Sequence, residues 1–312
     1  MHRLTFILNK GSLNWHSMSP IRLAHACAVV AVSALSCAPS IAQNGGSGPR
    51  VIQIPQTSAG AVPRIANVPS PRVLPPKVKL FQVFEHQWQG TGTKRYRDRY
   101  GVKGKKGFFF TSGLMIDADG SPRAFNRISD RGLDDLSNAG HPGDWWGIMT
   151  NNGETWGKPI VQGPHDPAPG FYISPTSLED TTKRETDPRR YVDAMKVPYI
   201  VLSGTAAQNQ NAHLGDYAVV LNKQNGKWAY AICGDDWPET KVGEGSIALA
   251  KILNIDANPR EGGVDDGVVY LIFPGSRKKP WRAEETVEQT NREAAKAFEA
   301  WGGIAQLKAL SK

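Results

Sequence analysis

Residues 216–234, DYAVVLNKQNGKWAYAICG, place two apolar runs on either side of a short polar segment. The polar segment contains Asn225-Gly226, a pair that tolerates the positive φ required by tight hairpin turns. Short apolar runs bounded by turn residues are typical of strands. The stretch therefore predicts a β-hairpin, and most of the chain from residue 78 onward repeats this pattern of short runs and turns.

Further strands and two helices follow from the same kind of pattern. The other runs that predict strands are 79–88 (KLFQVFEHQW), 107–125 (GFFFTSGLMIDADGSPRAF), 198–204 (PYIVLSG) and 267–275 (GVVYLIFPG). Ser246 is an expected N-cap for a short helix over 247–253, and 283–301 forms a second helix ended by Gly302-Gly303. Strands and helices do not alternate as in a parallel α/β sheet.

These elements predict a mainly β (α+β) fold. We expect a small closed β-barrel with a few peripheral helices, and with the helix after Glu244 packed at its rim. The double-psi type of barrel is suggested by analogy alone.

The N-terminal residues 1–42 have the character of a signal peptide. The apolar run 26–42 is preceded by basic residues and ends in a small-x-small pattern, so we expect cleavage after Ala42 and a secreted or periplasmic protein. Met18 is an alternative start. Lipidation at Cys37 is an alternative way of processing the same segment.

Residues 43–77 are rich in Gly, Ser and Pro and predict a flexible linker. The remaining residues, 78–312, are long enough to form one domain with its own core. Outside the leader the chain has one cysteine, Cys233. An intramolecular disulfide and a thiolate zinc site are therefore excluded, and Cys233 is expected to be a small buried residue.

The net charge of +8 is unevenly distributed. Residues 93–107 carry seven Lys or Arg against one Asp, and 277–282 add four more basic residues. Residues 115–145 and 231–245 are both acidic. If the two acidic stretches meet in the fold, their surface suits a cationic ligand. The stretch 93–107 is interpreted either as a solvated basic loop or as a contact to an anionic cell wall or membrane surface. No nucleic-acid partner is expected, because the basic residues lie in loop-like segments of an exported chain.

Most familiar catalytic signatures are missing from the sequence. It contains no HExxH, Walker loop, GxSxG or dinucleotide glycine pattern. No metal site is predicted, because the histidines outside the leader lack the spacing of metal ligands; these are His86, His141, His165 and His213. Carboxylates and aromatic residues are what remain for chemistry.

Asp235 follows a predicted strand, and Glu244 precedes a predicted helix nine positions later. Glycoside hydrolysis needs a carboxylic acid, a second carboxylate and flat aromatic faces that hold sugar rings. Trp237 lies between the two acids, and other candidates for stacking are Trp145, Trp146 and Trp156. The alternative is an Asp-Asp-Trp-Pro turn and a solvated glutamate near a helix N-terminus.

An ordered set of motifs extends this interpretation. The motifs are MIDADG (115–120), PYIVLSG (198–204), GDYAVVLN (215–222), YAICGDDWP (230–238), VGEGSIALAKIL (242–253) and VVYLIFPGS (268–276). In this combination and order they resemble glycoside hydrolase family 75, the fungal-type chitosanases, from about residue 107 to 276. The basic stretch 93–107 lies outside the resemblance. Cysteines of some family members have no counterpart here, so no disulfide carries over.

The resemblance implies endo-hydrolysis of chitosan, a β-1,4-linked glucosamine polymer, with inversion and without a metal or organic cofactor. It maps the two essential acids onto Asp235 and Glu244. The helix N-terminus after Glu244 favours the ionised form and hence a base. If both residues are buried, like-charge repulsion from Asp236 would raise the pKa of Asp235 and favour an acid.

Four further residues complete the expected substrate-binding set with Asp236 and Trp237. Asp117 and Asp119 are interpreted as a hairpin turn or as cleft residues that bind a substrate ammonium, whereas a calcium loop lacks its later ligands. Trp145 and Trp146 belong to 132–147, expected as a cleft wall or an ordered loop. We expect a monomer. The alternative functions are hydrolysis of another amino-sugar glycan, such as peptidoglycan, and non-catalytic binding of cell-wall polysaccharide.

Overall fold

The computed structural model describes residues 73–86, 94–204, 209–237 and 242–312. The predicted signal peptide, the cleavage and lipidation positions and most of the predicted linker lie outside these residues. Within them, no helix combines the length and the apolar character that crossing a membrane would require.

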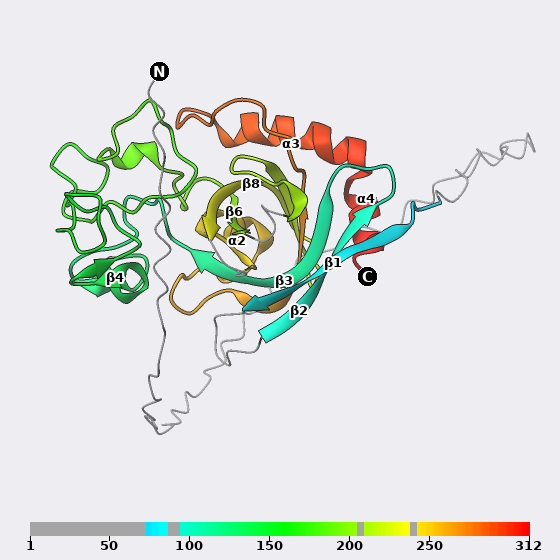
Figure 1. Ribbon diagram of the computed structural model, residues 1–312, viewed down its shortest axis with the longest axis horizontal. Helices are drawn as coiled ribbons and strands as arrows, with labels where there is room; N and C mark the ends of the chain where they lie inside the picture. The colour runs from blue at the N-terminus through cyan, green and yellow to red at the C-terminus, as the bar shows by residue number, and fades with distance from the viewer. Residues whose placement is uncertain (1–72, 87–93, 205–208, 238–241) are drawn as a thin grey trace, which may run out of the picture. The chain divides into compact units, whose positions relative to one another are not determined.

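Six strands close into a barrel (Figure 1). In order around the barrel they are β3 (Phe108–Asp117), β10 (Val264–Ile272), β7 (Tyr217–Asn222), β8 (Trp228–Trp237), β6 (Tyr199–Ser203) and β9 (Glu244–Ser246). Parallel pairing of β9 with β3 completes the circle. The small closed barrel expected from the sequence is thus confirmed, while its double-psi type stays a prediction.

The predicted hairpin at 216–234 is confirmed as β7 and β8, which pair antiparallel from Tyr217 opposite Ile232 to Leu221 opposite Trp228. Gly226 has a φ of 73° and donates its N–H to the carbonyl of Asn222 at 2.9 Å. The positive φ therefore falls on the glycine alone, and the turn is longer than a two-residue loop.

The barrel wall separates two clusters of buried side chains. The interior cluster includes Ala231, Cys233 and Leu114, and the buried Cys233 confirms its predicted role as a small core residue. Helix α2 (Ile247–Leu253) contributes Leu249 and Leu253 to this cluster. Its predicted N-cap is confirmed, because Ser246 accepts a hydrogen bond from the N–H of Leu249 at 3.1 Å.

The outer cluster lies beneath α3 (Val287–Trp301) and α4 (Gly303–Leu310). The helix expected over 283–301 begins at residue 287, because Thr286 and Gln289 form a capping box. It ends at the predicted glycines, but α4 follows directly and was not expected from the pattern.

The interpretation of 93–107 as a loop is wrong for most of its length. Residues Lys94–Val102 form β2, which pairs antiparallel with β1 (Lys77–His86) and extends the sheet from β3. Strand hydrogen bonds come from the backbone, so a high charge does not prevent pairing. Arg99 is fully buried and stacks on the ring of Phe110 at 3.8 Å, while Tyr100 stacks on Phe109.

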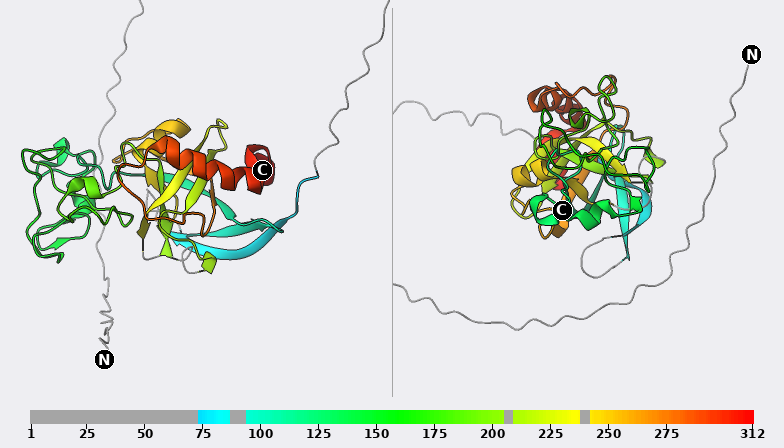
Figure 2. Two further views of the ribbon diagram at one scale, coloured as in Figure 1. Left: turned by 90° about the horizontal axis from the view of Figure 1, so that it is seen from above. Right: turned by 90° about the vertical axis from the view of Figure 1, so that its left-hand side faces the viewer.

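The segment between β3 and β6 lies beside the barrel, on the side away from the β1–β2 hairpin (Figure 2). It contains β4 (Gly140–His141), β5 (Asp144–Trp145) and three short 3₁₀ turns (129–131, 136–139 and 188–190). The strand predicted over 107–125 ends at Asp117, and Asp117-Ala118-Asp119-Gly120 is a turn that leads into this segment. It is not a hairpin turn, because β3 pairs only with β2, β9 and β10 among the described strands.

Candidate active site

The two acidic stretches meet in one pocket of about 290 Å³. Among the described residues that line it, no lysine or arginine is present. Its carboxylates are Asp117, Asp119, Asp235, Asp236 and Glu244. Trp146, Trp237 and Val201 line the remaining wall together with residues 175–177. The charge distribution suits a cationic ligand only if the two acidic stretches meet in the fold. They do meet, because residues from both stretches line this pocket.

Strand pairing brings Asp235 and Glu244 to the two sides of Val201. On one side Val201 of β6 pairs with Asp235 of β8. On the other side Ile200 pairs antiparallel with Gly245, a register that places Glu244 next to Val201. One strand therefore separates the two acids, which corresponds to about 10 Å between their backbones.

A β-bulge at Gly234 turns Asp235 out of the barrel. Along β8, Ala231 and Cys233 face the interior cluster, so strict alternation would also point Asp235 inward. The register jumps from Cys233 opposite Ile200 to Asp235 opposite Val201, which leaves Gly234 as the extra residue. One extra residue moves the side chains that follow it to the opposite face of the strand. A Cβ on Gly234 would lie 2.5 Å from Cβ of Tyr199, so this position requires glycine.

Asp235 is held by two backbone donors. Its Oδ1 accepts a hydrogen bond from the N–H of Ser177 at 2.9 Å and from the N–H of Asp236 at 2.8 Å. Burial raises the pKa of Asp235 to about 6, and the charge of Glu244 adds to the rise, while hydrogen bonds from the Ser177 side chain and from these two backbone donors oppose it. Like-charge repulsion was expected only if both aspartates were buried, and Asp236 is exposed; its backbone N–H lowers the pKa of Asp235.

Glu244 is positioned by the short strand β9. Ser246 of this strand accepts a hydrogen bond from the N–H of Tyr199 at 3.0 Å and donates one to the carbonyl of Val197 at 2.8 Å. A Cβ on Gly245 would lie 2.7 Å from the carbonyl oxygen of Tyr199. Close contact between β9 and β6 thus fixes the backbone on which Glu244 stands, two positions before the cap of α2.

Asp117 and Asp119 also line the pocket. The N–H of Asp119 donates to Asp117 Oδ1 at 2.8 Å, and Ser174 donates its hydroxyl to Asp119 Oδ1 at 2.8 Å. Burial, followed by the charges of Asp117 and Asp235, raises the pKa of Asp119 well above its usual range. The hydroxyl of Tyr199 donates to the carbonyl oxygen of Asp119 at 3.0 Å, which ties this turn to β6.

The tryptophans suggested by the sequence have different positions. Trp146 is 50% exposed and lines the pocket, as does Trp237. Trp145 is 7% exposed and packs in the interior cluster, so it offers no face to a ligand. Trp156 is exposed but does not line the pocket. Of the expected cleft wall 132–147, only Trp146 and Gly147 reach the pocket.

Ser174 and Ser177 are the site residues that sequence reasoning missed. Ser177 donates its backbone N–H to Asp235, and a hydrogen bond from its side chain also lowers the pKa of that carboxyl. A single serine far from Asp235 in the sequence gives no local signal for this contact. The described residues contain no group of three or more His, Cys, Asp or Glu arranged to hold a metal ion.

Comparison with known families agrees with this arrangement. The model of a family described as fungal chitosanase of glycosyl hydrolase group 75 matches residues 171–303, less than half of the 312-residue chain. The match includes Ser177, Asp235 and Glu244 and leaves out Asp117 and Asp119. No curated protein matches the chain. Over residues 171–303 the chain is similar to glycosyl hydrolase group 75, and this similarity indicates a chitosanase-like glycoside hydrolase.

Proposed function

We propose that this protein is an endo-acting hydrolase of β-1,4 linkages in chitosan or related, partly deacetylated glucosamine polymers. The observation that carries the proposal is the pocket with five carboxylates and, among the described residues, no basic side chain in its lining. A glucosamine polymer is a polycation when its amines are protonated, so this charge favours its binding. A peptidoglycan strand, which is acetylated and carries acidic groups, would gain much less from it.

Asp235 is the proposed general acid and Glu244 the proposed general base. Protonated Asp235 donates its proton to the glycosidic oxygen as the bond from that oxygen to C1 breaks. Glu244 takes a proton from a water molecule whose oxygen bonds to C1 from the opposite face of the sugar. The product therefore has the inverted anomeric configuration. The raised pKa of Asp235 supports its part, because an acid must hold its proton near the working pH.

The strand geometry supports inversion. Inverting pairs stand roughly 6.5–9.5 Å apart, which leaves room for the water, whereas retaining pairs stand about 5–5.5 Å apart. The backbones of Asp235 and Glu244 are about two strand spacings apart, which leaves room for their carboxyl groups to stand at the wider separation. Asp117 and Asp236 are proposed to bind substrate ammonium groups. Trp146 and Trp237 are proposed to stack on sugar rings.

The remaining parts of the proposal concern the whole chain. Export directed by residues 1–42, a linker over 43–77 and a single catalytic domain over 78–312 follow from the sequence patterns. The enzyme is proposed to act as a monomer without a metal or organic cofactor. Anionic cell-wall material is the proposed contact of the basic stretch 93–107.

The test is the release of reducing ends from soluble chitosan by the purified protein and by three variants. Asp235→Asn and Glu244→Gln should each lower kcat by about a thousandfold or more while the fold stays intact. Asp236→Asn is the matched control and should stay within about tenfold of wild type, because Asp236 binds substrate but transfers no proton. Proton NMR of the first product should show the α-anomer.

An equally severe loss in Asp236→Asn would mean that the acid is the wrong aspartate. Wild-type protein that is folded but inactive on chitosan, and active on another amino-sugar glycan, would disprove the substrate and leave the acid pair open. Binding of glycans without release of reducing ends from any of them would identify a non-catalytic wall-binding protein.

A further inference from the structure

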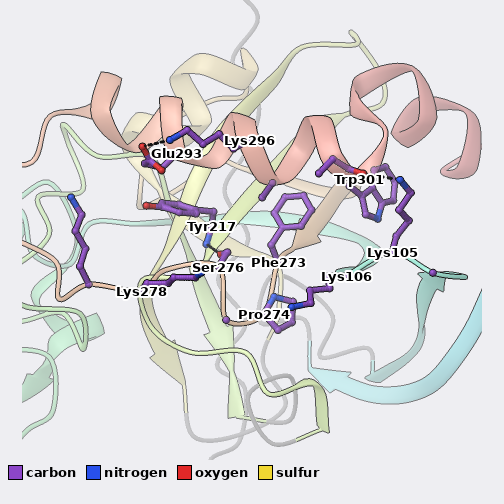
Figure 3. A pocket seen from close by; sticks show the side chains of 15 residues that line it. Lys105, Lys106, Tyr217, Phe273, Pro274, Ser276, Lys278, Glu293, Lys296 and Trp301 are labelled. Atoms are coloured by element: carbon purple, nitrogen blue, oxygen red, sulfur yellow. Dashed lines mark hydrogen bonds and ion pairs between the residues drawn. The ribbon is translucent and has the colours of Figure 1, made fainter.

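A second, larger cavity of about 730 Å³ lies between α3 and the loop that follows β10 (Figure 3). Its charge is opposite to that of the acidic pocket. Five lysines line it against a single glutamate: Lys105, Lys106, Lys278, Lys279, Lys296 and Glu293. Phe273 and Pro274 lie between the lysines of the two sides, as the close-up shows. The size is within the range of pockets that bind small molecules or short polymer segments.

The loop that carries Lys278 and Lys279 is rigidly held. Asp216 accepts hydrogen bonds from the N–H of Gly275 at 3.0 Å and of Arg277 at 3.3 Å. Arg277 also forms an ion pair with Glu285 at 2.7 Å, and both side chains are nearly buried. Hydrogen bonds donated to a buried carboxylate are costly to break, and so is a buried ion pair. The lysines of this side are therefore presented from a fixed backbone.

The opposite side of the cavity is fixed by the end of α3. Lys105 donates a hydrogen bond to the carbonyl oxygen of Ala300 at 2.7 Å, where the helix terminus favours positive charge. This bond holds the turn before β3 against α3 and places Lys106 at the cavity. The two basic stretches of the sequence, one at 93–107 and one at 277–282, thus meet in space.

Two of the five lysines that line the cavity have ammonium groups that no described carboxylate neutralises. Lys296 pairs with Glu293 at 2.7 Å, and Lys279 lies 3.8 Å from Glu285. Lys106 and Lys278 are exposed and form no hydrogen bond or ion pair through their side chains with the described residues. A concave site with unneutralised ammonium groups attracts anions.

The cavity is independent of the acidic pocket. The two share no lining residue. Lys106 lies just before the start of β3, and Asp117 is its last residue, so the length of the curved strand, roughly 30 Å along its path, lies between the two sites. Exposed charges are largely screened beyond about 8 Å at physiological ionic strength. The lysines can therefore hold an anion without repelling a polycation at the acidic pocket.

A neighbouring hollow extends the basic site along β1 and β2. This hollow of about 480 Å³ shares Lys105, Lys106 and Pro274 with the cavity and adds Lys103. Its apolar lining includes Val78 and Leu80, which are 42% and 43% exposed. The combined surface suits an extended chain better than a single small ion.

We propose that this lysine cavity binds a segment of an acidic polysaccharide through its carboxylate groups. The inference rests on the proposed function, because a cationic glucosamine polymer associates with anionic polymers by charge neutralisation. An enzyme that holds the anionic polymer at one site raises the effective concentration of the chitosan bound to it. Chitosan itself does not fit the cavity, because its ammonium groups would face the lysines.

Other polyanions fit the cavity less well. Single-stranded nucleic acid binds through bases stacked on exposed aromatic faces, whereas the aromatic residues here are only 1–5% exposed: Tyr217, Phe273 and Trp301. An anionic membrane is a flat surface and would not enter a concave site.

The test is affinity electrophoresis and calorimetric titration of the full chain with polygalacturonate. Lys106→Gln combined with Lys278→Gln should weaken binding about tenfold at low salt, since exposed charge contacts are individually modest. Lys223→Gln combined with Lys227→Gln is the matched control. It removes the same charge from exposed lysines outside the cavity and should change binding less than twofold. Wild-type binding should weaken with added salt.

The result separates this inference from the proposed function. Hydrolysis of soluble chitosan should be unchanged in the Lys106/Lys278 variant, and Asp235→Asn should bind polygalacturonate like wild type. Absence of wild-type binding at low salt would overturn the inference, as would an equal loss in the control variant. Binding of single-stranded DNA or phosphatidylglycerol vesicles in place of polygalacturonate would also overturn it.

Discussion

The backbone N–H of Ser177 donates a hydrogen bond of 2.9 Å to Asp235 Oδ1, although the two residues are 58 positions apart in the chain. Ser177 belongs to the irregular segment between β3 and β6, and Asp235 to a strand of the barrel. The bond therefore fixes the orientation of the proposed acid from outside the barrel. Charge on Asp235 is favoured by this donor, yet burial has the larger effect and keeps its pKa at about 6.

Hydrolysis should depend on pH through Asp235. A general acid works only in its protonated form, so the rate should fall as pH rises through about 6. Between pH 5 and pH 8 we expect kcat/KM to fall about a hundredfold, measured with short chitosan oligomers that stay dissolved. The Asp236→Asn variant should show the same falling limb. A flat or rising profile over this range would contradict the assignment of Asp235 as acid.

The carboxyl group of Asp235 should lower the free energy of unfolding at neutral pH. Its pKa is near 6 when folded and near 3.8 when unfolded, so the folded state binds more protons between these values. The free energy of unfolding therefore decreases as pH rises from about 4 to about 6, and the loss persists above. Asp235→Asn removes this effect while keeping an acceptor for Ser177. We expect its Tm to exceed that of wild type by a few degrees at pH 8 and by much less at pH 4. An equal difference at both pH values would exclude this origin.

Gly234→Ala should damage both the fold and the activity. The added Cβ would lie 2.5 Å from Cβ of Tyr199, an atom that cannot move without its strand. We expect a loss of about 1–3 kcal/mol in the free energy of unfolding. Displacement of Asp235 should lower kcat about a hundredfold in the molecules that remain folded. Urea unfolding and activity assays measure the two effects.

Gly163→Ala is the matched control for the bulge glycine. A Cβ added at Gly163 would lie 3.7 Å from its nearest atom, Oδ2 of Asp166, which is an ordinary contact distance. Stability and activity should therefore stay close to wild type. Unchanged activity in Gly234→Ala would show that the bulge does not position the acid.

Adjacent tryptophans should give opposite results on replacement by alanine. Trp146 is half exposed in the acidic pocket, so its loss should raise KM for chitosan about tenfold with little change in Tm. Trp145 is buried in the interior cluster, and its loss should cost about 3–5 kcal/mol of stability. Steady-state kinetics and thermal unfolding distinguish the two. A Trp146→Ala variant with unchanged KM would remove Trp146 from the substrate-binding set.

Local patterns in the sequence predicted much of the barrel. The hairpin at 216–234, the Ser246 cap and the buried Cys233 each depend on neighbours within a few positions, and all three were confirmed. Predictions from local patterns were wrong where contacts between residues distant in the chain determine the structure. The charged residues of β2 gave no strand signal, because their pairing with β1 and the packing of Arg99 on Phe110 are properties of the assembled sheet.

The sequence alone determined which residue types were available for chemistry: the acids Asp235 and Glu244, the neighbouring aspartates and an uneven charge. The tertiary structure decided how they are arranged. The bulge at Gly234 turns Asp235 out of the barrel, and Val201 separates it from Glu244 by one strand. Trp146 faces the pocket, whereas Trp145 packs in the core. The physical reason is that a side chain's face, burial and pKa depend on strand register and on residues distant in the chain, and no local pattern encodes either.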